Sequence, residues 1–561
     1  MPWLDVVLLA LAALFVVLHF VHLKADFPNN SQWKDWAKYT DEGWYGDAAI
    51  RHYVLGHWNV PGDFNAAAAL PVWPALELLL FRITGVSLTA ARALSVTVFA
   101  LTLGALYGLL RLWGRPSRWQ GRRSLAPTLT VVLLAVSPFC FVFTRLAILE
   151  PLLVLLTVLA LIAATRAGRA AAADGDSSRW RMSARAAGWA ALLGALLPLA
   201  ILTKTTALFL FPAILWMLYA GCAYRLWPLL RSAALAGTVA ALLWGGYYRL
   251  FVRPRFTVDY RYLFSANTYT GFRWNTLNSL LLDTLTDAVW VGRPLFWLSL
   301  CALGWALVRI VSGGAKRNPL ATTLLLWVLG YGAFLTYHAN LQPRYYLVVA
   351  PPLTALVALA FEWIRARAML TRTAAGAAVL TLASAAVAYT GVRAATHTTQ
   401  FLLHPEYTWL SAAHRVQDIV DREAKSGHPR LLLSISGSEL TLMTGVPSIC
   451  DDFGTLNLID RVARYRPGWF ATWNDMEDDK MEALSPLYRV ERVSAIPAFD
   501  DPDRNLLILY RLDPLPTPGA YSSRGRRRRP VFTPRVLRTP VRDRTVEKAQ
   551  TPWAGNELEP Q

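Results

Sequence analysis

The sequence has little charge and little cysteine for its length. Only 17% of its 561 residues are charged, whereas soluble domains typically carry about 25%. Of the four cysteines, Cys140, Cys222 and Cys301 lie in apolar runs and Cys450 has no cysteine near it, which argues against a disulfide framework. The sequence also lacks a Walker loop, a dinucleotide-binding fingerprint and a nucleophile elbow. Any reaction must therefore use an already activated substrate.

Long apolar runs are abundant instead. Hydrophobic residues make up 55% of the chain, and many runs are long enough to cross about 30 Å of hydrocarbon. We expect eleven spans, at about 3–23, 88–112, 126–143, 150–165, 186–202, 206–223, 232–248, 290–309, 320–337, 345–364 and 373–391. The first is interpreted as a retained helix, because it lacks a basic leader and a cleavage site. Residues 66–81 are short and contain Pro71 and Pro74, so we expect a re-entrant or surface segment.

The net charge of +19 follows the loops between these runs. Cations gather in alternate loops, at 111–123, 166–185, 225–231, 309–317 and 365–372, whereas the opposite short turns hold Arg145, Lys204 and Arg344 singly. The positive-inside rule then places the N-terminus in the cytoplasm and the two longer loops, 24–87 and 249–289, outside. We interpret the positive charge as a topology signal and expect a bilayer, not nucleic acid, as partner.

Composition divides the chain into three parts. We predict an all-α polytopic membrane domain over 1–392 and a small extracytoplasmic α/β domain over 393–513. In the second part, residues 430–436, 468–473 and 505–511 are typical of strands, and 455–465 of an amphipathic helix. Residues 514–561 are basic and rich in proline and arginine, which predicts a disordered tail.

The segment TDEGWYGDAAIRHY, residues 40–53, carries the first candidate acids. Thr40 is suited to cap a helix, and Asp41 and Glu42 suit its first turn. This pattern is explained either by a helix start with favourable charges or by a carboxylate that acts as general base or metal ligand. The sequence leaves both interpretations open.

Further charged residues stand at predicted turns on the same side. Glu150 begins a span, where an acid is costly and is either functional or part of an ion pair. Lys204 interrupts two apolar runs, as a snorkelling lysine or a phosphate contact. Arg344 and Tyr345 follow at a later turn, and guanidinium groups bind phosphate oxygens through paired hydrogen bonds.

The loop from residue 249 interleaves arginines with Phe and Tyr side chains, and Arg255 and Arg261 are among them. Such a pattern could bind single-stranded nucleic acid in a soluble protein. On the outer side of a membrane, a lipid-linked phosphate is the anion that we expect.

The order of these motifs resembles the GT-C superfamily. Asp41, Glu42 and Tyr45 in the first outer loop, with the later motifs, resemble the bacterial protein O-mannosyltransferase and aminoarabinose transferase group. The later motifs are Arg145 with Glu150, Leu202–Thr203–Lys204, and Arg344–Tyr345–Tyr346 before Pro351 and Pro352. The resemblance covers about residues 1–365. It implies a multi-pass bacterial inner-membrane enzyme that transfers a hexose or pentose, with inversion, from a polyprenyl-phosphate donor to an acceptor hydroxyl of a glycan, lipid or protein.

Residue roles follow from the same resemblance. It makes Asp41 the general base, with Glu42 and Glu150 as further catalytic acids, and it allows a divalent cation (Mg²⁺ or Mn²⁺) held by Asp41 and Glu150. The donor phosphate would meet a set of cations and phenols: Tyr45, Lys204, Arg255, Arg261, Arg344 and Tyr345. Several relatives have a lysine before a Pro-Pro pair at the end of the first loop, but FNAAAALPVWP (64–74) has none. We therefore expect the arginine-rich loop to contact the phosphate.

Other classes of protein remain open. A polymerase or ligase of lipid-linked glycans would use the same donor chemistry. A lipid transporter would show repeated halves and polar residues near midspan, and neither is evident. An inactive binding relative is the alternative if Asp41 is dispensable.

Overall fold

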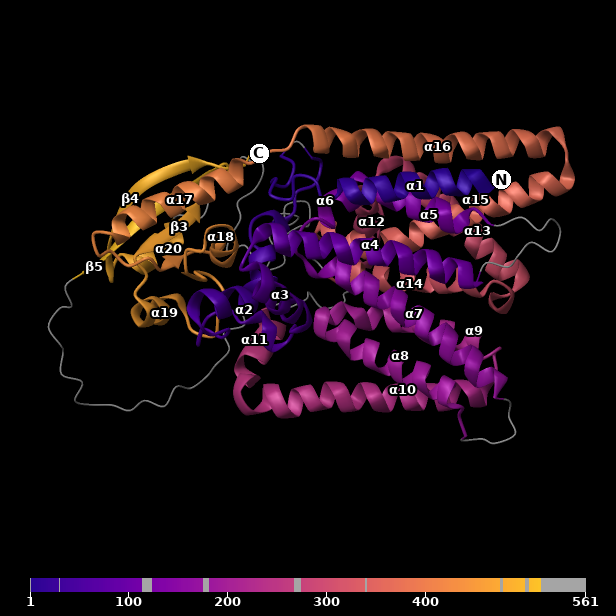
Figure 1. Cartoon of the computed structure of the whole chain (residues 1–561), viewed down its shortest axis with the longest axis horizontal. Coiled ribbons are helices and arrows are strands. Elements are labelled where there is room, and N and C mark those ends of the chain that lie inside the picture. Colours follow the sequence, from indigo (N-terminus) through magenta and orange to yellow (C-terminus); the bar gives the residue numbers. More distant parts are fainter. Residues whose placement is uncertain are drawn as a thin grey trace.

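A computed structural model describes residues 2–29, 31–113, 124–174, 181–266, 274–338, 341–474, 478–499 and 504–515. Helices of a membrane domain lie beside a smaller domain that carries a sheet (Figure 1). The last described residue is Leu515, so the predicted basic tail, residues 514–561, lies outside the described residues from position 516 onward. Parts of two cation-rich loops, 114–123 and 175–180, also lie outside them.

Every expected span falls on helical structure. The helices are α1 (Pro2–Leu18), α4 (Leu88–Trp113), α5 (Ala126–Ala135), α6 (Pro138–Phe143), α7 (Leu149–Ala173), α8 (Ala184–Thr203), α9 (Phe211–Gly221), α10 (Leu226–Tyr247), α13 (Arg293–Gly313), α14 (Pro319–Tyr337), α15 (Ala350–Thr371) and α16 (Ala374–Leu403). Within the described ranges, seven helices are long and apolar enough to cross a membrane. The predicted all-α polytopic domain is therefore confirmed.

Helix α7 is the centre of this bundle. In its most apolar stretch, 83% of the residues are buried. The helix packs against α4, α8 and α9. A helix that is apolar on all sides must be surrounded by other helices or by lipid, and here helices surround most of it. The N-terminus of α7 is therefore fixed in the interior, which matters because Glu150 lies there.

The predicted span at 126–143 is broken. Helix α5 ends at Ala135, and α6 begins after Ser137, whose side chain accepts a hydrogen bond from the Cys140 N–H at 3.3 Å. Pro138 occupies the first turn of α6, where its missing N–H costs nothing. A serine cap and a proline together therefore start a new helix.

The first long loop is mostly helical. It holds η1 (Trp36–Lys38), α2 (Asp41–Leu55), η2 (Ala66–Ala68) and α3 (Val72–Thr84). The 13 residues of α3 rise only about 20 Å, which is too short to cross a bilayer and agrees with its exclusion from the spans.

The second long loop differs from the expectation. The chain stays helical after α10 ends at Tyr247, because the π-helical segment η4 (Tyr248–Phe256) leads directly into α11 (Thr257–Ala266). Pro254 lies inside η4, and a wider turn with i→i+5 hydrogen bonds accommodates a residue without an N–H. The remaining elements are η5 (Trp274–Thr276), α12 (Leu277–Asp287) and η6 (Ala288–Val291).

The small domain has a mixed five-stranded sheet in the order β2-β1-β3-β5-β4. Its elements are α17 (Thr408–Ala424), β1 (Leu432–Leu433), α18 (Gly437–Thr444), β2 (Ser448–Ile449), α19 (Leu458–Tyr465), β3 (Trp469–Trp473), α20 (Asp478–Leu484), β4 (Tyr488–Pro497) and β5 (Leu506–Pro514). Strand β1 pairs in parallel with β2 and β3, whereas β5 is antiparallel to β3 and β4. The predicted α/β character is confirmed, with two edge strands that the sequence did not indicate.

The predicted domain boundary at residue 393 lies inside a helix. Helix α16 runs on to Leu403 and stops before Pro405, since the residue that precedes a proline is disfavoured in helical geometry. The small domain's own first helix, α17, begins at Thr408.

The two domains meet at the first loop (Figure 1). The Asp26 carboxylate accepts hydrogen bonds from the backbone N–H groups of Trp409 and Leu410 at the start of α17. The Glu439 carboxylate in α18 accepts from the Gly43 N–H of α2 at 2.6 Å. A Cβ atom at Gly43 would lie 2.0 Å from the Glu439 nitrogen, so only glycine permits this approach. The small domain thus holds helix α2 in place.

Candidate active site

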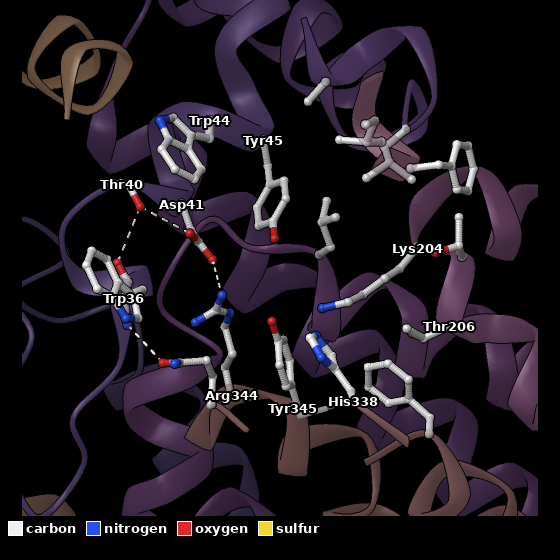
Figure 2. A pocket seen from close by; sticks show the side chains of 18 of the residues that line it. Trp36, Thr40, Asp41, Trp44, Tyr45, Lys204, Thr206, His338, Arg344 and Tyr345 are labelled. Carbon is white, nitrogen blue, oxygen red and sulfur yellow. Dashed lines mark hydrogen bonds and ion pairs between the residues drawn. The ribbon is translucent and has the colours of Figure 1, made fainter. Parts of the chain in front are cut away.

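A cavity of about 270 Å³ opens where α2 faces the turns after α8 and α14 (Figure 2). It is lined by Trp36, Thr40, Asp41, Trp44, Tyr45, Phe64, Ala66, Leu70, Leu149, Lys204, Thr205, Thr206, Leu208, Phe209, Leu263, Phe264, Phe334, Tyr337, His338, Gln342, Arg344 and Tyr345. Most of these side chains are aromatic or aliphatic. The Asp, Lys and Arg side chains among them are Asp41, Lys204 and Arg344.

Asp41 is the carboxylate that lines this cavity. It begins α2 after Thr40, which stands at the predicted cap position but makes no capping bond. Asp41 is only 2% exposed, and its Oδ2 lies 3.0 Å from Nη2 of Arg344. Burial raises the pKa of Asp41 to about 6, while the charge of Arg344 acts in the opposite direction. Asp41 is therefore a buried group that can exchange a proton near neutral pH, not a solvated first-turn acid.

Arg344 is held by a second carboxylate, Asp35. The Arg344 backbone N–H donates to Asp35 at 2.9 Å, and its guanidinium pairs with the same carboxylate. Asp35 also accepts from the Ala37 N–H at 2.8 Å. Two bonds to one carboxylate, one from the backbone N–H and one charge-assisted bond from the guanidinium, fix the position of Arg344 before any ligand arrives.

Lys204 comes from the extended residue between α8 and η3 (Thr205–Leu210). Its ammonium group pairs with Glu150 and lies 4.4 Å from the centre of the Tyr345 ring. Glu150 is in the first turn of α7, where the helix dipole favours an acid. Arg145 donates instead to the carbonyls of Val21 and His22.

The structure brings together most of the predicted site residues. Asp41, Tyr45, Lys204, Arg344 and Tyr345 line the cavity, and Figure 2 shows their side chains converging from separate elements. Glu150 is connected to this group through its ion pair with Lys204, and its side chain is fully buried.

Three predicted residues lie apart from this group. Glu42 is not among the described residues that line the cavity; its Oε2 pairs with Nη2 of Arg92 at 2.5 Å and its Oε1 accepts from the Ala147 N–H. Arg255 and Arg261 are exposed on the helix that continues α10. That helix contributes Leu263 and Phe264 to the cavity wall instead.

Asp35 is the residue that sequence reasoning missed. It stands in SQWKDWAKYT among other polar and aromatic residues, and no spacing distinguishes it. Its contact with Arg344 joins positions 309 apart. Its local role in the structure is to cap the short helical turn η1 that follows it, which does not indicate a contact with Arg344.

A divalent cation does not fit the arrangement of Asp41 and Glu150. Each carboxylate faces a cation, Arg344 and Lys204 respectively. In the part of the chain that the structure describes, no three His, Cys, Asp or Glu side chains are grouped to hold a metal ion. Mg²⁺ and Mn²⁺ prefer several oxygen ligands, and two carboxylates that are each paired with a cation do not provide them.

The helical bundle with a small domain docked on its first loop is the GT-C type of fold that the sequence predicts, and it is similar to that of two solved structures. One solved structure with this fold is ArnT from Cupriavidus metallidurans bound to undecaprenyl phosphate, with a TM-score of 0.57, 16% identity, and coverage of 91% of this chain and 98% of that chain. Another is the apo oligosaccharyltransferase of Archaeoglobus fulgidus, with a TM-score of 0.51, 14% identity, and coverage of 85% and 70%. No protein-family model and no curated protein matches the sequence.

Proposed function

We propose that this protein transfers a sugar from a polyprenyl-phosphate donor to an acceptor hydroxyl, with inversion, on the extracytoplasmic side of a bacterial inner membrane. The observation that carries the proposal is the cavity that joins Asp41 to Lys204 and Arg344 within apolar walls. Such a transfer needs a carboxylate that can accept a proton and cations that can face a phosphate. The fold supports it, since a structural neighbour is described as bound to undecaprenyl phosphate.

The cations act on the leaving group. When the bond between the anomeric carbon and the phosphate oxygen breaks, negative charge grows on the phosphate. Groups that face this charge lower the barrier if they are in place beforehand. Arg344 is fixed by Asp35, and Lys204 is held by Glu150, so little reorganisation is required.

Asp41 acts on the acceptor. The acceptor oxygen forms its bond to the anomeric carbon on the face opposite the leaving phosphate, which inverts that centre, and its proton passes to Asp41. A base works best when its pKa lies near the working pH, and burial raises the pKa of Asp41 to about 6. Tyr45 and Tyr345 line the same space and supply hydroxyl groups for hydrogen bonds to the phosphate or sugar.

Donor use by a Lys204→Met variant tests this proposal. The full chain in proteoliposomes receives a panel of polyprenyl-phosphate hexoses and pentoses, and release of polyprenyl phosphate is measured. We expect Lys204→Met to slow release by about 100-fold, as is typical when a charge-stabilising donor is removed. Lys34→Met is the matched control, because Lys34 is an exposed lysine in the first long loop. Equal rates in wild type and Lys204→Met would contradict the proposal.

A further inference from the structure

A second cavity of about 700 Å³ lies between α13, α16 and the first loop. It is distinct from the first cavity, because no residue lines both. Four of its lining residues are cationic or can become so: Arg293, Arg393, His397 and His404. Among the described residues that line it, none is an aspartate or glutamate.

Three polar residues of this cavity form a stripe on α16. Arg393, His397 and Gln400 are spaced four and three residues apart, which keeps them within about 60° around the helix axis. His404, the residue that directly follows α16, continues the stripe toward the small domain. Arg293 joins them as the first residue of α13, whose start has no side-chain cap. Positive charge from two elements therefore faces one space.

These arginines differ from the other cations at this end of the bundle. Lys204 and Arg344 are buried in ion pairs, and Arg145 is satisfied by backbone carbonyls. Within the part of the chain that the structure describes, Arg393 donates to the Tyr389 hydroxyl, at 3.0 Å, and no group forms an ion pair with Arg293 or Arg393. Two guanidinium groups without a carboxylate partner leave donors free for an external anion.

Most of the remaining lining is apolar. Trp33, Leu133, Leu295 and Phe401 line the cavity, together with the polar Ser31, Gln32 and Thr390. Beside the cavity, α16 carries the apolar side chains of Val392 and Leu403, each 67% exposed. A small inorganic anion would gain nothing from such walls, whereas an amphiphile would bury its chains against them.

We propose that this cavity binds an anionic phospholipid, with the phosphate between Arg293 and Arg393 and the acyl chains along α16. The imidazoles of His397 and His404 add hydrogen-bond donors at the rim. The lipid is held at the junction where α16 leads into the small domain, so it also supports the connection between the domains. The inference does not depend on sugar transfer.

Native mass spectrometry of the full chain in neutral detergent tests the site. Phosphatidylglycerol, phosphatidylcholine and soluble glycerol 3-phosphate are titrated separately onto wild type, Arg293→Gln/Arg393→Gln and Arg415→Gln/Arg422→Gln. The last variant removes the same charge from exposed positions on α17. We expect phosphatidylglycerol to bind wild type and the control equally and the cavity variant at least about tenfold more weakly, since bonds to charged groups contribute strongly.

Each ligand has a defined outcome. Binding of phosphatidylglycerol in preference to both other ligands supports the proposal. Equal binding of phosphatidylcholine would mean an unselective apolar surface, and equal binding of glycerol 3-phosphate would mean a soluble-phosphate site. Either result, or an unchanged affinity in the cavity variant, overturns it.

Discussion

Three carboxylates and two cations meet at the first cavity. Asp35 and Arg344 are joined through two groups, and Glu150 pairs with Lys204. Asp41 has the weakest hold, a single ion-pair contact at 3.0 Å to a guanidinium already engaged by Asp35. With every group ionised the cluster would carry one negative charge in excess. Asp41 is therefore the carboxylate of this cluster whose charge is compensated least by a neighbouring cation.

This leads to a pH dependence of turnover. Burial raises the pKa of Asp41 to about 6, so its base form is depleted as the pH falls below that value. We expect the rate of sugar transfer to be nearly constant above pH 7 and to fall by about tenfold per pH unit well below 6. Turnover in proteoliposomes, buffered equally on both sides, measures the profile. A rate that stays flat down to pH 4.5 would exclude Asp41 as the base.

At the scale of the element, helix α2 points two adjacent acidic side chains in different directions. Asp41 and Glu42 are about 100° apart around the axis, so only one can face the cavity. Asp41 does so, while Glu42 pairs with Arg92 of α4. The sequence contained both acids but not the rotation of the helix, which is decided by packing against α3 and α18 and by the ion pair with Arg92 of α4.

The Glu42–Arg92 pair predicts a loss of stability rather than of chemistry. Breaking a buried ion pair by removing one partner typically costs about 3–5 kcal/mol. We expect Glu42→Gln to lower the unfolding temperature while turnover per folded molecule stays within a few-fold of wild type. Asp421→Asn is the control, because its pair with Arg430 is exposed and such pairs contribute about 1 kcal/mol or less. A folded, stable Glu42→Gln protein without activity would return Glu42 to the catalytic group.

Much of the fold could be predicted because its signals are local. The apolar runs gave the helices, and the isolated cations Lys204 and Arg344 stood out where charge is costly. The sequence predicts a loop from residue 249, and such a loop would let Arg255 and Arg261 contact the donor phosphate. A π-helical turn at Pro254 lets the helix continue, and both side chains are exposed. Asp35 was missed because its meaning depends on a residue 309 positions away.

At the scale of the whole molecule, helix α2, which carries Asp41, and the small domain share one end of the bundle (Figure 1). The cation-rich loops meet elsewhere, where Arg231 donates to the carbonyls of Ala171 and Arg181, and Tyr224 to that of Lys316. This separation of charge is the basis for the predicted orientation.

Thiol labelling of intact cells measures that orientation. In a variant without the four native cysteines, single cysteines replace Lys34, Arg415 or Arg317, which are all exposed. We expect a membrane-impermeant reagent to label positions 34 and 415 from outside and to reach 317 only after lysis. Labelling of 317 alone in intact cells would reverse the topology.

The account depends most directly on Asp41, and sugar transfer by Asp41→Asn tests it. Asparagine keeps the shape of the side chain and serves equally well at a helix start, but it cannot accept the proton. At equal abundance in the membrane, we expect Asp41→Asn to transfer sugar about 10²–10⁴-fold more slowly than wild type, while Asp418→Asn, exposed on α17, remains fully active. Unchanged turnover of Asp41→Asn would contradict the assignment of Asp41 as the general base.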